Sequence, residues 1–255
     1  HGTDCVSFPE INYGNLRSPL MRYFTQKSYQ WASIILPVSE SLVYTENNYF
    51  SEKVLKFGYT HHLNNIKTPY KVIPNGLIIN DWSRDANISK EEGSFMTVLA
   101  PGKIVIKGTD LIIKAAKSFP NCKFYFAGID NIEGVELTDN VICLGRLNPL
   151  ELKHWYSKTQ FYLQLSNTEG FGVALCEAML CECVPIVSDV NFLPSIVGDS
   201  GFVLKRRNAD FLVKLISSAL KSELKHLEKE SRKRIETKFS SDKRKEMLVL
   251  ALNNY

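Results

Sequence analysis

The residues of this chain best suited to chemistry are two glutamates, Glu169 and Glu177, with the glycine turn Gly170-Phe171-Gly172 between them. An apolar strand-like run precedes the turn and an apolar helical run follows it, so the turn leads from a strand into a helix. The start of a helix offers free backbone N–H groups and the positive end of the helix dipole, which together suit a phosphate. The pattern therefore places a carboxylate on either side of a predicted phosphate site.

The separation of the two glutamates indicates which chemistry they serve. If residues 169–177 were wholly helical, the two residues would lie roughly 12 Å apart. Glycosidases hold two catalytic carboxyls about 5 Å apart when they retain configuration and within about 10 Å when they invert it, so a glycosidase pair is disfavoured. The larger separation suits the two ends of a sugar nucleotide, with one carboxylate on the sugar hydroxyls and the other on the ribose diol.

From residue 95 onward, short apolar strands alternate with helical patterns. Continuous apolar strands separated by helices are typical of a parallel sheet covered on both faces, which predicts a doubly wound, Rossmann-like α/β domain. Ligands of such sheets bind at the carboxyl ends of the strands, where the turn at 170–172 is expected. The strands are predicted over residues 95–99, 123–127, 141–144, 161–165, 185–188 and 201–204, and the helices over 108–119, 149–158, 171–182, 192–197, 208–221, 223–239 and 242–253.

The first 75 residues supply about half of the length of a complete Rossmann-like domain, which needs roughly 100–150 residues. They predict a helix over residues 16–31, a strand over 33–37, a helix over 40–56 and a strand over 71–73. The polar segment 75–94 contains Asn-Gly and Glu-Glu-Gly and is typical of a linker. We therefore expect a partial N-terminal domain over residues 1–75 and a complete C-terminal, nucleotide-sugar-binding domain over residues 76–240.

Composition limits the classes of partner. The chain has 255 residues, of which 44% are hydrophobic and 23% charged, and its formal net charge is +4. This charge is too small to imply nucleic acid, and no nucleic-acid-reading motif appears. No apolar run reaches the length of a membrane span and no signal peptide is visible, although the start at His1 leaves a removed leader open. The cysteines lack metal-finger spacing, which favours buried thiols in a reducing cytoplasm over zinc or a disulfide.

Taken together, these features resemble the family 4 retaining glycosyltransferases of the GT-B fold, in which two Rossmann-like domains face each other across a cleft. Glu169 and Glu177 match both glutamates of that family's E-x7-E motif, and Lys107-Gly-Thr-Asp-Leu-Ile-Ile is similar to its K-G-x-D-x-L-I helix start. The segments 1–4, 72–76, 124–128 and 141–146 are also similar to family segments. The resemblance implies that this chain lacks the front half of the N-terminal domain, and that residues 241–255 pack back onto that domain.

For catalysis, the resemblance implies that Lys107 and Lys103 stabilise the leaving diphosphate, with Lys103 in the place of a family arginine. Preorganised groups that face a developing charge contribute about 10²–10³ each in rate. Glu169 is expected to hold the transferred sugar, although a carboxylate before a glycine turn also serves as a helix cap. His1 matches a histidine that reaches the donor sugar, although a terminal residue is usually mobile.

For donor binding, the resemblance assigns the ribose diol to Glu177 and places the nucleotide base near Gly145 and Arg146; a plain surface arginine is the alternative for Arg146. An unpaired carboxylate in the apolar run around Glu177 is costly, and a ribose diol supplies two hydrogen bonds to it. A glutamate paired with a lysine is the alternative there. The predicted donor-binding set is completed at the helix start by Gly170, Phe171, Gly172 and Val173.

The chain departs from the family pattern at two places. Glu182 replaces the glycine of a C-G-x-P turn, which indicates a more ordinary backbone there or a carboxylate near the cleft. Ser195 replaces a glutamate that is common in the family. Neither position is one of the expected diphosphate-binding residues.

The predicted reaction is metal-independent transfer of a sugar, with retention, from a nucleoside-diphosphate sugar to a glycan or lipid-linked acceptor in polysaccharide or glycolipid biosynthesis. We expect a hexosyltransferase that uses no cofactor. The chain contains no D-x-D triplet, so we also expect no metal site. The resemblance implies that the departing phosphate takes the acceptor's proton. A non-catalytic sugar-nucleotide-binding fragment and a GT-B epimerase are the alternatives, and the sequence leaves both an active and an inactive truncated chain open.

The segment 17–31 combines basic and aromatic residues, and two interpretations of it stay open. Basic aromatic helices dock on anionic membranes, which favours peripheral contact with the inner membrane surface. The alternative is a helix packed within the N-terminal domain. The expected location is therefore cytoplasmic, with or without contact with the membrane.

Overall fold

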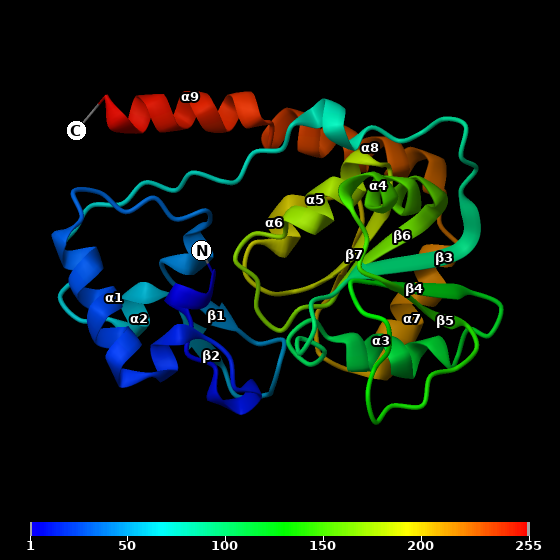
Figure 1. Ribbon diagram of the computed structural model, residues 1–255, viewed down its shortest axis with the longest axis horizontal. Coiled ribbons are helices and arrows are strands. Elements are labelled where there is room, and N and C mark those ends of the chain that lie inside the picture. The colour runs from blue at the N-terminus through cyan, green and yellow to red at the C-terminus, as the bar shows by residue number, and fades with distance from the viewer. Residues whose placement is uncertain (1, 254–255) are drawn as a thin grey trace.

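A computed structural model describes residues 2–253, which form two lobes (Figure 1). The larger lobe is built on a six-stranded sheet with the strand order β5-β4-β3-β6-β7-β8, and every neighbouring pair is parallel. This order confirms the predicted doubly wound α/β architecture. The strands are β3 (Glu91–Val98), β4 (Lys123–Ala127), β5 (Val141–Gly145), β6 (Thr159–Gln164), β7 (Val184–Ser188) and β8 (Phe202–Leu204).

Helices cover both faces of this sheet, with α3 and α7 on one face and α4, α5, α6 and α8 on the other (Figure 1). The strands are apolar because both of their faces are covered. Phe95 on β3 stacks on Phe124 of β4 and on Phe161 of β6, with ring centroids 4.8 Å apart in each pair. The helices are α3 (Thr109–Ala116), α4 (Pro149–Lys158), α5 (Val173–Leu180), α6 (Leu193–Val197), α7 (Ala209–Leu220) and α8 (Leu224–Lys238).

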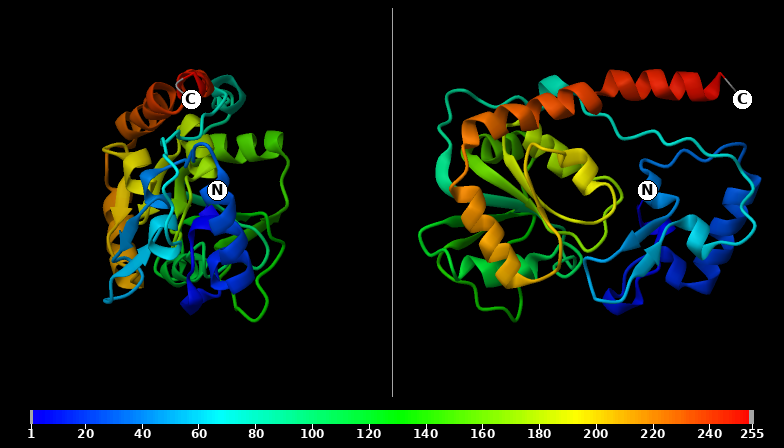
Figure 2. Two further views of the ribbon diagram at one scale, coloured as in Figure 1. Left: turned by 90° about the vertical axis from the view of Figure 1, so that its left-hand side faces the viewer. Right: turned by 180° about the vertical axis from the view of Figure 1, so that it is seen from behind.

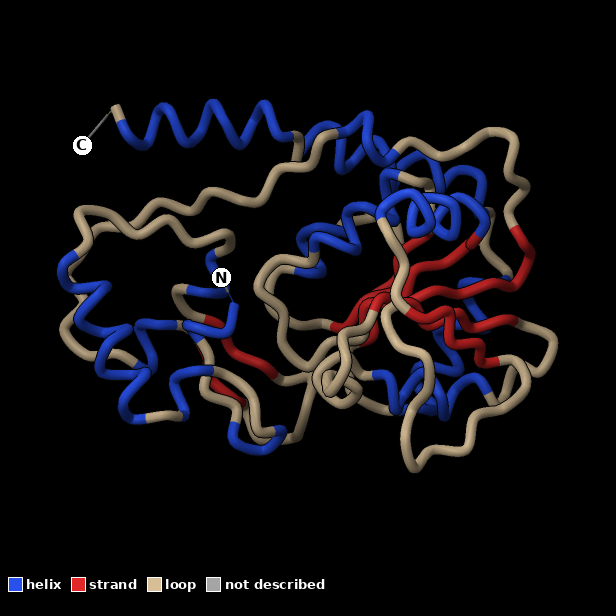
Figure 3. Tube along the Cα trace, in the orientation of Figure 1, coloured by secondary structure: helices blue, strands red, loops and turns tan. Residues whose placement is uncertain are grey.

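The smaller lobe contains little regular structure and consists mainly of loops and short helices (Figure 3). Its longest helix is α1 (Pro19–Trp31), which begins with Ser18 as its cap and Pro19 at its first position. The other elements are the 3-10 helices η1 (Gly2–Cys5), η2 (Pro9–Ile11), η3 (Asn15–Arg17) and η4 (Glu40–Leu42), the strands β1 (Thr45–Asn47) and β2 (Leu55–Phe57), and α2 (Tyr59–His62).

The predicted helix over residues 40–56 is wrong. The segment forms η4 and then an antiparallel pairing of β1 with β2. The side chain of Asn47 accepts hydrogen bonds from the backbone N–H groups of Tyr49 and Phe50 at 3.0 and 3.2 Å, which turns the chain between the strands. Asparagine favours such local turns over helix.

The predicted strands over residues 33–37 and 71–73 are present only as an irregular pairing. Ile35 and Tyr70 form an isolated parallel bridge, and the N–H of Ile73 donates to the carbonyl of Pro37 at 2.9 Å. Prolines at 37, 69 and 74 interrupt the segments, and proline cannot donate to a ladder.

The linker, with η5 (Ile79–Trp82), joins the two lobes, and the last helix, α9 (Ser241–Leu252), extends from the larger lobe along the same side of the molecule (Figure 2). The N–H of Leu77 donates to the carbonyl of Phe239, and the N–H of Ser241 donates to the carbonyl of Leu77, both at 2.8 Å. The α9 helix thus leaves the larger lobe against the linker. Within residues 2–253, no helix is both long and apolar enough to cross a bilayer.

Candidate active site

A cavity of about 450 Å³ lies at the carboxyl ends of β3 and β6, between the two lobes. The smaller lobe contributes Gly2, Thr3, Tyr13 and Val38, and the linker contributes Asn75. The larger lobe contributes Val98, Leu99, Ala100, Lys107, Gln164, Glu169, Gly170, Phe171, Gly172, Val173 and Ala174. This is the end of a parallel sheet at which ligands bind.

In the cavity wall, the carboxylate of Glu169 forms an ion pair with Lys107, with Nζ 2.7 Å from Oε2. The same oxygen accepts a hydrogen bond from Nε2 of Gln164 at 2.8 Å and one from the hydroxyl of Ser166 at 3.3 Å. Its partner oxygen accepts from the N–H of Gly170 at 3.2 Å. The carboxylate is therefore held in one orientation, and the ammonium of Lys107 is fixed beside the start of α5.

Two glycines allow this arrangement. Gly172 has a φ of +105° and is the first residue before α5, with no side chain to cover the free N–H groups of the first turn. Gly108 has a φ of +68°, and a Cβ atom there would lie 2.1 Å from the carbonyl oxygen of Leu165. The start of α3 can approach the loop after β6 only because residue 108 is glycine, and this approach brings Lys107 to Glu169.

Glu177 lies within α5 and is half-buried, and it does not line the cavity. Burial raises its pKa to about 7. Burial, and then the charge of nearby Glu177, also raises the pKa of Tyr162. The hydroxyl of Tyr162 donates to Oε1 of Gln164 at 3.2 Å, so Gln164 connects the surroundings of Glu177 with Glu169.

Lys103 and His1 are the other predicted catalytic residues. Lys103 is exposed, with its ammonium 5.3 Å from the ring centroid of Tyr13, a residue of the cavity wall. His1 lies outside the described residues; its neighbour Gly2 lies against Gly170.

The predicted donor-binding residues divide into two groups. Gly170, Phe171, Gly172 and Val173 line the cavity, and the ring of Phe171 packs against Phe192 and Phe239. Gly145 and Arg146, at the end of β5, are not part of this wall. Arg146 is exposed.

At Glu182 the expectation of a more ordinary backbone is wrong. Glu182 has a φ of +62°, the left-handed conformation that glycine adopts most easily. Its carboxylate forms an ion pair with Arg84 of the linker, with 3.1 Å between Nη1 and Oε2. The ion pair ties the turn after α5 to the linker, and Glu182 does not line the cavity.

Sequence reasoning missed residues that hold Glu169 in place. Besides Gln164, the side chain of Asn191 accepts hydrogen bonds from the N–H of Glu169 at 2.9 Å and from the hydroxyl of Thr168 at 3.1 Å. A signal existed for Gln164, since it is a buried polar residue in the apolar strand β6. For Asn191, 22 residues away along the chain, the sequence offered none.

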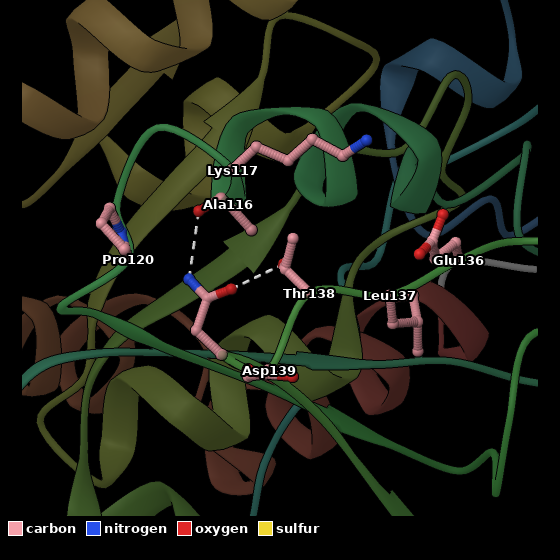
Figure 4. Close-up of a pocket in the computed structure, with 8 residues that line it drawn as sticks. Ala116, Lys117, Pro120, Glu136, Leu137, Thr138 and Asp139 are labelled. Atoms are coloured by element: carbon pink, nitrogen blue, oxygen red, sulfur yellow. Dashed lines mark hydrogen bonds between the residues drawn. The ribbon is translucent and has the colours of Figure 1, made fainter.

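A second, larger cavity of about 630 Å³ lies at the opposite end of the sheet, between the end of α3 and the loop before β5 (Figure 4). The amide of Asn140 donates to the carbonyl of Ala116 at 3.0 Å, and its oxygen accepts from the hydroxyl of Thr138 at 2.6 Å. Since these groups satisfy one another and lie at the amino end of β5, the smaller cavity is the candidate site.

The described part of the chain contains no group of three or more histidine, cysteine, aspartate or glutamate side chains that could hold a metal ion. All six cysteines are free thiols, and all are buried or half-buried: Cys5, Cys122, Cys143, Cys176, Cys181 and Cys183.

Solved structures of similar shape establish the fold. The chain superposes on sucrose-phosphate synthase from Thermosynechococcus elongatus with a TM-score of 0.76 at 17% identity, covering 97% of this chain and 64% of that one. It superposes on the Anabaena protein HepE, solved in complex with UDP and glucose, with a TM-score of 0.75 at 15% identity, covering 93% of this chain and 68% of that one. These glycosyltransferase neighbours show that the chain has the GT-B fold.

Curated relatives are similar over parts of their length. The gpi3 subunit of phosphatidylinositol N-acetylglucosaminyltransferase from Schizosaccharomyces pombe is 27% identical over 169 residues, which is 61% of this chain and 36% of that protein. The O-antigen chain mannosyltransferase B of Escherichia coli is 31% identical over 80 residues, which is 31% of this chain and 21% of that protein. The chain thus spans about a third or less of the length of these relatives.

The family model described as "Glycosyl transferases group 1" matches residues 83–238. This segment contains the whole sheet of the larger lobe, Lys107, Glu169 and Glu177. Because it is more than half of the chain, the chain belongs to the glycosyl transferases group 1 family.

Proposed function

We propose that the protein is a metal-independent, retaining hexosyltransferase of family 4, which uses no cofactor and moves a sugar from a nucleoside-diphosphate sugar to a glycan or lipid-linked acceptor. The observation that carries this proposal is the cavity at the end of the sheet, in which Lys107 and the glycine start of α5 lie side by side. A fixed ammonium next to free backbone N–H groups suits a diphosphate.

The diphosphate is the leaving group of this reaction. In the proposal, Lys107 and the N–H groups at the start of α5 bind its oxygens, and Lys103 adds positive charge from the rim. As the bond between the sugar and the phosphate breaks, negative charge grows on the phosphate, and these groups stabilise it. The departing phosphate oxygen then takes the proton of the acceptor hydroxyl as the new glycosidic bond forms on the same face.

The two glutamates hold the two ends of the donor in this proposal. Glu169 already accepts several hydrogen bonds in a fixed orientation, which prepares it to meet the hydroxyls of the transferred sugar. Glu177, within α5, accepts hydrogen bonds from the two ribose hydroxyls. His1 contacts the sugar, and the nucleotide base lies near Gly145 and Arg146. The raised pKa of Glu177 fits a carboxylate that gains by receiving two hydroxyl donors.

The names of the relatives suggest which substrates to test first. HepE was solved with UDP and glucose, and the Schizosaccharomyces pombe relative is named for transfer of N-acetylglucosamine to phosphatidylinositol. We propose UDP-sugars as first donors and a lipid-linked acceptor at the inner membrane surface, with the protein in the cytoplasm. The α1 helix exposes Tyr23, Phe24 and Trp31, which favours peripheral contact with that surface. Co-sedimentation with anionic liposomes at low salt tests the contact, and a lack of binding contradicts it.

The reaction is tested by proton NMR of UDP-glucose, GDP-mannose and ADP-glucose, each incubated with the protein in the presence of EDTA. With water as the acceptor, we expect slow release of a sugar whose first-formed anomer has the configuration of the donor. Release of the opposite anomer contradicts retention, and dependence on added metal contradicts the metal-independent route. Epimerisation of the intact donor supports the alternative of an epimerase, and binding without turnover supports a non-catalytic module.

A further inference from the structure

Arg207, in the turn between β8 and α7, joins three separate parts of the molecule. Its Nη2 lies 2.7 and 2.6 Å from the two carboxylate oxygens of Asp110, in the first turn of α3. Its Nε donates to the side-chain oxygen of Asn167 at 3.0 Å. Its backbone N–H donates to the carbonyl of Tyr49 in the smaller lobe at 2.9 Å.

Two of these contacts tie together the segments that carry the central ion pair. Asp110 is three residues after Lys107, and Asn167 is two residues before Glu169. Arg207 and the ion pair of Lys107 with Glu169 are therefore two cross-links between the same two segments. A backbone bond supports them, since the N–H of Asn167 donates to the carbonyl of Ile106 at 2.8 Å.

The third contact adds the smaller lobe to this cross-link. The guanidinium of Arg207 lies 5.6 Å from the ring centroid of Phe50, and the side-chain amide of Asn47 donates to the carbonyl of Asn167 at 2.8 Å. Only 19% of the Arg207 side chain is exposed, so its hydrogen bonds are largely shielded from water. Charged hydrogen bonds in such places are stronger than those on an open surface.

We propose that Arg207 is a positioning residue of the transferase. It holds the Lys107 segment and the Glu169 segment at the separation that the diphosphate needs, and it makes that separation depend on the position of the smaller lobe. Its planar guanidinium can bond to Asp110 and Asn167 at once, which the single ammonium of a lysine cannot reproduce. The effect on nucleotide binding rests on the proposed function; the cross-link itself does not.

The test compares Arg207→Met with Arg206→Met. Arg206 is the exposed neighbour of Arg207. Among the hydrogen bonds described for it, its guanidinium donates only to the carbonyl of Asn48 in the smaller lobe. The Arg206 variant therefore shows the effect of losing one arginine hydrogen bond to that lobe. Hydrogen exchange, followed by mass spectrometry, reports on the amide of Asn167. We expect exchange about tenfold faster in Arg207→Met, because charged hydrogen bonds are lost, and no change in Arg206→Met.

The functional readout is calorimetric titration of UDP, GDP and ADP at a temperature where each variant is folded. We expect about tenfold weaker binding of the preferred nucleotide in Arg207→Met, partial rescue in Arg207→Lys, and unchanged binding in Arg206→Met. Asp110→Asn removes the negative charge that Arg207 contacts. It should also speed hydrogen exchange at Asn167 and weaken nucleotide binding, so the inference stays testable if the Arg207 variant folds poorly.

Three outcomes overturn the inference. One is unchanged exchange at Asn167 in both Arg207→Met and Asp110→Asn; another is equal acceleration in the Arg206 and Arg207 variants. The third is faster exchange with unchanged nucleotide affinity, which makes the role of Arg207 purely structural. If the unaltered protein binds none of the three nucleotides, the proposed function fails, while the exchange experiment still decides whether Arg207 joins the two segments.

Discussion

At the scale of single residues, the ion pair of Lys107 with Glu169 sets the charge of the candidate site. Both side chains are partly exposed, at 27% and 17%, so the attraction is moderated by water and contributes little to folding. A diphosphate carries more negative charge than one carboxylate, and it can therefore compete for the ammonium. The ion pair therefore orients the ammonium of Lys107 and contributes little to the free energy of unfolding.

Removal of the ammonium should therefore affect turnover far more than folding. In Lys107→Ala we expect donor hydrolysis to fall by about 10²–10³, the usual cost of losing one preorganised group that stabilises a leaving charge. The free energy of unfolding should change by no more than about 1 kcal/mol. Lys114→Ala, which changes an exposed lysine on α3, is the control and should change neither quantity. Equal hydrolysis rates in the two variants would show that Lys107 does not meet the leaving group.

Glu177 gives a prediction for the pH dependence of stability. Burial raises its pKa from 4.5 to about 7, so between these pH values the folded protein holds a proton that the unfolded chain has released. The contribution of Glu177 to the free energy of unfolding therefore falls as the pH rises from 4.5 to 7, by an amount on the order of 3 kcal/mol.

Glu177→Gln has no such titration, and the measurement is urea unfolding of both proteins at pH 5 and pH 8. Relative to the unaltered protein, the glutamine variant should gain stability as the pH is raised. If the difference between the two proteins is the same at both pH values, Glu177 does not titrate as the structure predicts.

At the scale of elements, the start of α3 depends on the close approach of Gly108 to the loop after β6. Gly108→Ala would place a Cβ atom 2.1 Å from a backbone oxygen, which the loop can relieve only by moving. Gly134 is a matched control, because its φ of +69° is almost the same and a Cβ atom there would meet no other atom within 4 Å.

We expect Gly108→Ala to lose about 3 kcal/mol or more of unfolding free energy and its nucleotide binding, whereas Gly134→Ala loses only the left-handed penalty of about 1 kcal/mol. Urea unfolding of the two variants measures the difference. Similar losses in both would mean that the backbone angle alone, and not the contact with Leu165, requires glycine at 108.

The elements of the larger lobe were predictable from sequence for a physical reason. The inner strands β4, β6 and β7 are almost wholly buried, so an apolar run such as 123–127 marks the position of a strand clearly, and β4 has the predicted bounds. The segment 40–56 carries a mixed pattern, and the side chain of Asn47 turns the chain there. The turn preference of asparagine was a signal against the predicted helix, but the hydrophobic pattern does not show which of the two prevails. Glu182 likewise adopts a glycine-like backbone with its carboxylate paired to distant Arg84.

At the scale of the whole molecule, the candidate site lies between two lobes that the linker connects, and α9 packs against this linker. Arg244, on α9, donates to the carbonyl of Pro74 at 2.8 Å and to the side-chain oxygen of Asn75 at 2.7 Å. Asn75 lines the cavity, so α9 supports one of its walls. The site is assembled from distant segments, which is why sequence patterns identified Lys107 and Glu169 but not the residues that join them.

The contribution of α9 can be measured with Arg244→Ala. The loss of charged hydrogen bonds to the linker should lower the thermal midpoint by about 5 °C and speed proteolysis within residues 71–80. Lys245→Ala, an exposed neighbour on the same helix, should leave both unchanged. Equal behaviour of the two variants would mean that α9 does not hold the linker in solution.

The most direct test of the central claim, that the cavity between the lobes binds a nucleoside diphosphate, is calorimetric titration of UDP, GDP and ADP. The unaltered protein is compared with Lys107→Ala and Glu177→Ala, each first shown to melt cooperatively. The account predicts that one nucleotide binds and that both substitutions weaken it about tenfold or more. Binding that is unchanged in both variants, or no binding by a cooperatively folded unaltered protein, would contradict it.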